Sequence, residues 1–233
     1  MKNAGVKIAV VGAESTGKSQ LASALADALR SQGKTVALVG EYLREWCDLH
    51  GRTPGASEQL LIAHAQMQRV QAAIAAGSQV VIADTTALMT AVYSDMLFND
   101  DSLYSFASVH QRSYDVTLLT GLDLPWVADG IQRDGPHTRE PTDNRLRQAM
   151  DRAALPYRVV YGTGATRCEN ALRAVEDIKL IANYSIRTWE KDVFYPQKQS
   201  EVSPQATRTV WTWPCEKCSD PDCEHRLFSQ LLR

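Results

Sequence analysis

Short apolar runs alternate along this chain with longer stretches in which apolar residues recur at helical spacing. The short runs predict buried strands at residues 6–11, 35–40, 79–84, 114–120 and 157–162. The longer stretches predict helices at residues 19–33, 57–77, 86–98, 102–112 and 166–187. Strands that alternate with helices indicate a parallel sheet with right-handed crossovers and helices on both faces. Ligands of such a sheet bind at the carboxyl ends of its strands.

The stretch at 57–77 carries the most detailed helix prediction. Ser57 is the expected N-cap and Gly77 the expected stop. The expected apolar side of this helix holds Leu60, Leu61, Met67, Val70 and Ile74. Cys47, Cys168 and His64 are expected to be packing residues.

Length and composition narrow the class of protein. A chain of 233 residues with net charge −2 fits one α/β domain with a tail, and it lacks the basic field expected of a protein whose main substrate is nucleic acid. No apolar run reaches the roughly 20 residues that span a bilayer. The N-terminus leaves no room for a signal peptide before the first glycine loop, so we expect a cytoplasmic protein without membrane attachment.

"GAESTGKS", residues 12–19, fits the phosphate-loop pattern G-x-x-x-x-G-K-[ST] between a predicted strand and a predicted helix. Its glycines let the backbone turn its N–H groups toward phosphate oxygens. Lys18 is expected to reach the outer phosphates of ATP, and the Ser19 hydroxyl to hold Mg²⁺. The predicted ATP-binding residues are Gly12, Glu14, Ser15, Thr16, Gly17, Lys18 and Ser19.

Asp84 ends the apolar run "VVIA", where a buried acid needs a cation or hydrogen-bond donors. We expect it to orient Mg²⁺ or the water around that ion. The alternative is a helix N-cap, because Thr85 and Thr86 follow, and the two roles are compatible.

The segment "GEYLREW" places Glu41 at the mouth of the second predicted strand, with Arg44 three residues later. Glu41 could accept a hydrogen bond from an acceptor hydroxyl, and Arg44 could hold phosphate or orient Glu41. An exposed ion pair worth under about 1 kcal/mol is the structural alternative. Whether Glu41 or Asp84 would act as the base is open at this point.

Residues after the fourth predicted strand resemble a lid. In "DLPWVADGIQRDGPHTREP", glycines allow bending near residues 127–141, while Arg133 and Arg139 supply charge for a transferring phosphoryl group. Trp126 is either a packing residue of the core or an aromatic side chain that stacks on a flat ligand. No N-K-x-D guanine signature is present, which disfavours a GTP switch.

Together "GAESTGKS", "EYLREW", "IADTT" and "PWVADGIQRDG" resemble the ribosylnicotinamide kinase domain of the NadR family over residues 6–182. The resemblance implies a P-loop NTPase three-layer sandwich of the AAA type that transfers the γ-phosphoryl group of ATP to the 5′-hydroxyl of nicotinamide riboside, for NAD synthesis. The cationic nicotinamide ring could stack on Trp126, and Asp123 or Asp129 could bind ribose or add negative charge.

The resemblance has departures. Relatives often carry a second acid two residues after the strand-end aspartate, where this chain has Thr86; this puts a base role for that second acid in doubt and favours Glu41, with Asp84 still open. Long NadR proteins also carry a DNA-binding module and an adenylyltransferase domain, and this chain shows no H-x-G-H signature.

Residues 188–233 form an expected extension after a kinase domain at 1–187. Cys215, Cys218, Cys223 and His225 supply enough ligands for a tetrahedral Zn²⁺ site, with free thiols as the alternative. Tryptophans in this extension favour packing on the kinase domain or on a protein partner.

The sequence thus predicts an ATP- and Mg²⁺-dependent kinase of a small molecule. Two alternatives stay open: a kinase of another nucleoside or nucleotide, and a nucleotide-binding switch that acts through a partner at the extension.

Overall fold

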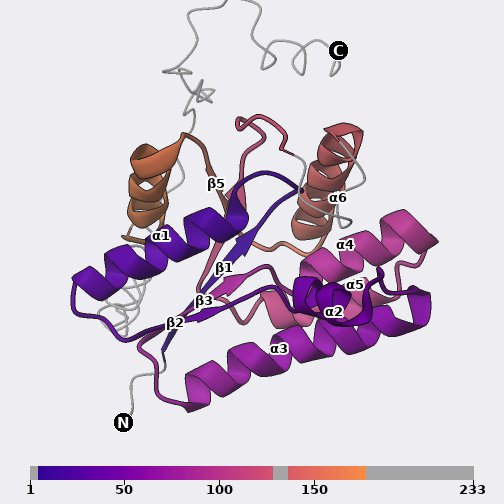
Figure 1. Cartoon of the computed structure of the whole chain (residues 1–233), viewed down its shortest axis with the longest axis horizontal. Coiled ribbons are helices and arrows are strands. Elements are labelled where there is room, and N and C mark those ends of the chain that lie inside the picture. Colours follow the sequence, from indigo (N-terminus) through magenta and orange to yellow (C-terminus); the bar gives the residue numbers. More distant parts are fainter. Residues whose placement is uncertain (1–4, 128–135, 177–233) are drawn as a thin grey trace, which may run out of the picture. The chain divides into compact units, whose positions relative to one another are not determined.

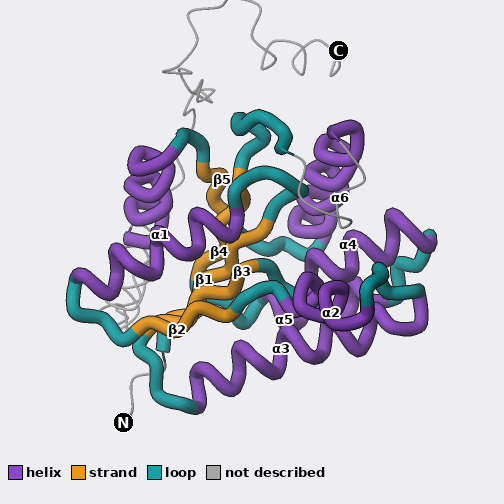
Figure 2. Tube along the Cα trace, viewed as in Figure 1, coloured by secondary structure: helices purple, strands orange, loops and turns teal. Residues whose placement is uncertain are grey.

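Five parallel strands form a central sheet in the computed structural model, which describes residues 5–127 and 136–176. The strands are β1 (Val6–Val11), β2 (Val36–Val39), β3 (Val80–Asp84), β4 (Val116–Thr120) and β5 (Arg158–Val160). Their order across the sheet is β2-β3-β1-β4-β5. Figure 1 labels β1, β2, β3 and β5, and Figure 2 labels all five strands. The five predicted strands and their parallel arrangement are confirmed.

Helices connect the strands and cover both faces of the sheet (Figure 2). They are α1 (Lys18–Ser31), α2 (Tyr42–His50), α3 (Gln59–Ala75), α4 (Ala87–Phe98), α5 (Leu103–Gln111), α6 (Arg139–Arg152) and a helix at residues 164–176. Two short 3₁₀ turns, η1 (Ala56–Glu58) and η3 (Pro136–Thr138), precede α3 and α6. In the described parts of the chain, no helix has the length and apolar character needed to cross a membrane.

Alternate residues of each strand enter two separate cores, because successive side chains of a strand point to opposite faces. On one face Ile8 and Val10 pack with α1 and the helix at 164–176. On the other, Ala9 and Val11 pack with apolar residues of α3, α4, α5 and α6. The arrangement is the three-layer α/β sandwich that the sequence predicts.

The start of α3 corrects one prediction. Ser57 lies inside the turn η1 and is not an N-cap, because Glu58 accepts the Gly55 N–H at 2.8 Å and α3 begins at Gln59. Leu60 and Leu61 are exposed, at 46% and 60%, although the apolar pattern placed them inside. The buried face instead contains Gln59, Ile62, Ala63, Gln66 and Val70.

Strand register gathers the predicted site at one edge of the sheet. Val10 of β1 pairs with Asp84 of β3, and Val11 pairs with Leu119 of β4. The carboxyl ends of β1, β3 and β4 therefore meet, and this is the edge at which parallel sheets bind ligands.

Candidate active site

Residues 12–17 form a tight loop between β1 and α1. Ser15 and Gly17 have positive φ values of 56° and 77°, in the left-handed region. A Cβ atom at Gly12 would collide with the Thr120 hydroxyl, and one at Gly17 would lie 2.9 Å from Leu124 Cδ1. Close packing against the end of β4 therefore requires glycine at position 12, while the left-handed φ of Gly17 favours glycine there.

Two buried threonines attach this loop to the sheet. The hydroxyl oxygens of Thr16 and Thr120 lie 2.6 Å apart. Thr16 donates its one hydroxyl proton to the Ala13 carbonyl at 2.7 Å, so Thr120 is the donor of the pair; Thr120 Oγ1 also lies 3.3 Å from the Val11 carbonyl. These contacts tie the middle of the loop to its beginning and to β4.

The Glu41 carboxyl interacts electrostatically with Lys18, Asp84, Glu14 and Arg44. Lys18 Nζ donates to the Ala13 carbonyl at 2.8 Å. Burial raises the pKa of Glu41; Asp84 and Glu14 raise it further, while Lys18 and Arg44 lower it. Asp84 is 6% exposed. Its Oδ1, and Oε2 of Glu14, are buried with no hydrogen-bond partner among the described residues.

Gln66 of α3 joins the two loops that carry Glu41 and Asp84. Its side-chain oxygen accepts the Tyr42 N–H at 2.8 Å, and its amide nitrogen donates to the Gly40 carbonyl at 3.2 Å. The same nitrogen reaches the Thr85 carbonyl at 3.4 Å. The buried amide thus holds the residues on both sides of Glu41 and the residue after Asp84.

Thr86, and not Asp84, caps α4. Its hydroxyl accepts the Leu88 N–H at 3.3 Å and donates to Gln111 at 2.7 Å. Gln111 in turn donates to Thr117 at 2.9 Å. The Thr86 hydroxyl, at the position where relatives carry a second acid, is therefore part of a buried hydrogen-bond network. The Asp84 carboxylate does not cap α4.

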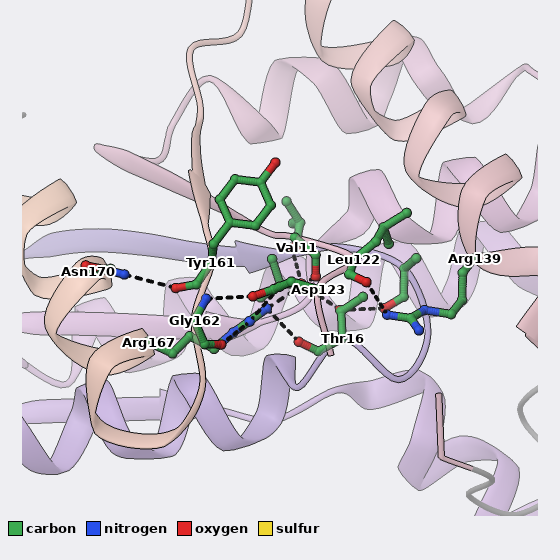
Figure 3. Close-up of polar contacts among 12 residues, drawn as sticks. Val11, Thr16, Leu122, Asp123, Arg139, Tyr161, Gly162, Arg167 and Asn170 are labelled. Atoms are coloured by element: carbon green, nitrogen blue, oxygen red, sulfur yellow. Dashed lines mark hydrogen bonds and ion pairs between the residues drawn. The ribbon is translucent and has the colours of Figure 1, made fainter. Parts of the chain in front are cut away.

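Arg44 and Arg139 take different positions. Arg44 Nε lies 3.9 Å from Glu41 Oε2, and its side chain is 42% exposed. Arg139 is the first residue of α6, is 9% exposed and donates to the Leu122 carbonyl at 3.3 Å (Figure 3). The end of the predicted lid segment is thus the start of a helix.

The described end of the β4 loop contacts the phosphate loop. The Val127 N–H donates to the Ser15 hydroxyl at 2.7 Å. The preceding residue, Trp126, is half-buried, and its Nε1 has no hydrogen-bond partner within the described ranges. The indole therefore lies next to a residue that is fixed on the phosphate loop, and its N–H is not held by a core contact.

Asp123 has partners other than the expected ligand. Its carboxylate accepts the Gly162 N–H at 2.6 Å and an Arg167 N–H at 2.9 Å (Figure 3). Desolvation raises the pKa of Asp123, but these hydrogen bonds outweigh it and hold the pKa below its ordinary value. Asp123 therefore connects the loop after β4 with the loop after β5.

A family model described as an AAA domain matches residues 7–167, which is more than half of the chain. The chain belongs to this AAA domain family. No curated protein matches the sequence.

Solved structures share the fold of this AAA domain at low sequence identity. A NadR protein in complex with NR has a TM-score of 0.59 and 18% identity, and the match covers 76% of this chain and 52% of that one. A NadR protein in complex with NAD and AMP-PNP has a TM-score of 0.60 and 18% identity, with 76% and 50% covered. The chain thus spans about half the length of these NadR proteins. Thymidylate kinase from Ehrlichia chaffeensis has a TM-score of 0.53 and 14% identity, with 76% and 98% covered. The P-loop kinase fold implied by the motif resemblance is confirmed.

Some of the residues that the sequence predicts to bind substrate, phosphate or metal fall outside the described ranges. These are Asp129, Arg133 and the Cys215, Cys218, Cys223 and His225 cluster. Within the described ranges, no group of three or more Cys, His, Asp and Glu side chains is arranged to hold a metal.

Two polar residues of the site escape sequence reasoning. Gln66 and Arg167 are 2% and 4% exposed, and both contact backbone groups of the site loops. A polar residue on the apolar side of α3, four residues from both Ile62 and Val70, is the signal for Gln66. Arg167 carries no such signal.

Proposed function

We propose that this chain is an ATP-dependent kinase that phosphorylates the 5′-hydroxyl of nicotinamide riboside in the cytoplasm, as a step of NAD salvage. The observation that carries the proposal is the Glu41 carboxyl, whose side chain is 12% exposed and whose charge environment includes Lys18 and Asp84. A phosphate loop binds the donor, and a carboxyl group of raised pKa near its lysine is suited to an acceptor hydroxyl.

Each described residue has a separate part in the proposed transfer. Lys18 exchanges its contact with the Ala13 carbonyl for the outer phosphates, where its charge offsets that of the moving phosphoryl group. Glu41 accepts the hydrogen bond of the acceptor hydroxyl and takes its proton as the new O–P bond forms and the bond from the γ-phosphorus to the bridging oxygen breaks, which releases ADP. The raised pKa of Glu41 makes it a better proton acceptor than an ordinary glutamate.

The residues present fit a magnesium ion. The buried Asp84 Oδ1 lacks a hydrogen-bond partner among the described residues, as expected of an oxygen that faces a cation or its water. Ser19, at the start of α1, and Asp84 would hold the ion. An Mg²⁺ ion held there would neutralise part of the charge of the phosphates.

For the acceptor, the proposal assigns Trp126 to stacking. The nicotinamide ring of the riboside is a cation, and a cation over an indole gains about 0.5–2 kcal/mol. The half-buried indole and its position next to Val127 support this assignment. Asp129, Arg133 and Arg139 are proposed to complete the acceptor and phosphoryl contacts. The Cys and His cluster of the extension is proposed to hold structural Zn²⁺.

The test is product formation from ATP and Mg²⁺, measured by mass spectrometry with the full chain. The acceptors are nicotinamide riboside, a neutral nucleoside, a nucleoside monophosphate and water alone. We expect a mononucleotide from the riboside in strong preference, and formation slowed by about 10²- to 10³-fold in the Lys18→Met variant. Preferred use of the monophosphate would instead assign the chain to nucleotide kinases, and phosphate release only to water would refute a kinase.

A Trp126→Leu variant separates the acceptor from the donor in the same assay. Leucine keeps apolar contact but removes the π face, so KM for the riboside should rise about threefold to tenfold while KM for ATP changes less. An equal rise in both KM values would refute stacking.

A further inference from the structure

Arg167 is a buried arginine near the start of the helix at 164–176, and its guanidinium group reaches three loops of the site edge (Figure 3). It donates to the Gly162 carbonyl at 2.7 Å, after β5, and to the Gly121 carbonyl at 3.3 Å, after β4. It also donates to the Thr16 carbonyl of the phosphate loop at 3.0 Å. Asp123 balances its charge at 2.9 Å.

The contact with Thr16 has a consequence for phosphate binding. The Thr16 carbonyl and the Gly17 N–H belong to one peptide group, which is planar and trans. Holding the carbonyl on the side of Arg167 therefore turns the Gly17 N–H to the opposite side. Gly17 has a φ of 77°, a conformation in which a glycine peptide can otherwise rotate readily.

We propose that Arg167 is a positioning residue for the nucleotide: it fixes the Thr16–Gly17 peptide so that the Gly17 N–H faces the phosphates before they bind. The inference rests on nucleotide binding at the phosphate loop, which the proposed function includes, and not on the identity of the acceptor. Arg167 itself does not touch the nucleotide.

The shape of the side chain explains why an arginine is needed. One guanidinium nitrogen serves Asp123 and Gly162, while the other serves Thr16 and Gly121. A planar fork of donors satisfies these four acceptors together, whereas a lysine presents a single ammonium group. Lysine at this position would keep the charge but could not hold all three loops at once.

The test compares ADP and AMP binding to the full chain by isothermal titration calorimetry with Mg²⁺. The two ligands share adenosine and one phosphate. The Kd of AMP divided by the Kd of ADP therefore measures how much the outer phosphate of ADP adds to binding at the phosphate loop. We expect Arg167→Met to reduce this ratio about tenfold and Arg167→Lys to reduce it less. Arg173→Met, an exposed arginine on the same helix, should leave the ratio unchanged.

Equal weakening of ADP and AMP in folded Arg167→Met would overturn the proposal, because it would show an effect on the adenosine side or on the fold alone. Thermal unfolding is measured for each variant. If Arg167→Met does not fold, Arg167→Lys and Asp123→Asn decide by the same ratio, with an unchanged ratio in both refuting the inference. A wild-type chain that binds ADP but phosphorylates no acceptor would refute only the proposed reaction, whereas one that binds no ADP would overturn this inference as well.

Discussion

The phosphate loop and the neighbouring loops after β2 and β3 are held by different chemistry. On the side of β4 and β5, the charged Arg167 and the Thr16–Thr120 pair fasten the loop. On the side of β2 and β3, the neutral amide of Gln66 holds the residues around Glu41 and Asp84. A neutral holder beside the carboxyl groups leaves the raised pKa of Glu41 in place, whereas an arginine there would lower it. The side of β4 and β5, where the proposed phosphate donor binds and which we call the donor side, can be held by the Arg167 cation because Asp123 balances its charge.

The largest expected effect comes from Lys18, which acts on both sides. Lys18→Met should lower kcat by about 10²- to 10³-fold, since it removes a charge aimed at the transferring group. Lys18 also lowers the pKa of Glu41, so the variant should move the residual acid limb of the pH–rate profile to higher pH. Single-turnover rates between pH 5 and 9 measure both effects. A normal kcat would remove Lys18 from the site.

A change at Gln66 should affect only the side of β2 and β3, which the proposed function assigns to the phosphate acceptor and which we call the acceptor side. Gln66→Leu removes the donors and the acceptor that hold Gly40, Tyr42 and Thr85, so Glu41 is no longer held in place. Misplacement of a reacting group by about 1 Å can cost on the order of 10²-fold, and we expect a loss of kcat of that order. The Kd of ADP should stay within about twofold of wild type.

The matched control is Gln68→Leu, the same substitution at an exposed position of the same helix. If Gln66→Leu weakens ADP binding as strongly as Arg167→Met does, the two sides are not independent and the comparison fails.

The two sides also differ in how far the sequence predicts them. The glycine, lysine and serine of the phosphate loop could be found because the motif states its own spacing, and Asp84 because an acid ends an apolar strand. The parallel sheet and its three layers followed from apolar runs that alternate with helices, whereas the strand order came from the structure alone.

The residues that hold these groups could not be found in the same way. The partners of Arg167 lie 151, 46, 44 and 5 residues away along the chain, so local pattern says nothing of them. Leu60 and Leu61 misled the periodicity argument, because a buried Gln66 takes a place on the inner face that an apolar residue would normally fill. Polar side chains that serve backbone groups break the binary pattern, which is why they were missed.

Glu41→Gln should separate stability from activity on the acceptor side. The folded-state pKa of Glu41 is raised, mainly by burial, so its ionised form destabilises the fold. Its favourable contribution is complete below the unfolded pKa and is lost as pH rises through the folded pKa. The variant should therefore have a higher Tm than wild type at pH 8, with the difference vanishing near pH 4, while kcat falls. Scanning calorimetry without nucleotide measures the Tm values, and a lower Tm of the variant at pH 8 would contradict the burial argument.

The smallest expected effect tests the threonine pair of the donor side. Thr120→Val keeps the shape beside Gly12 but removes a buried hydroxyl, while Thr16 keeps its bond to the Ala13 carbonyl. The lost hydrogen bonds should lower the free energy of unfolding by about 1 kcal/mol, and Thr120→Ser should restore most of it. The ratio of ADP to AMP affinity should fall by less than in Arg167→Met, because the Thr16 carbonyl keeps its guanidinium partner. Denaturant titration and calorimetry measure the two quantities. An equal fall in the ratio for both variants would mean that the hydroxyl pair orients the phosphate loop as much as the arginine does, and that the charge of Arg167 is not what distinguishes the donor side.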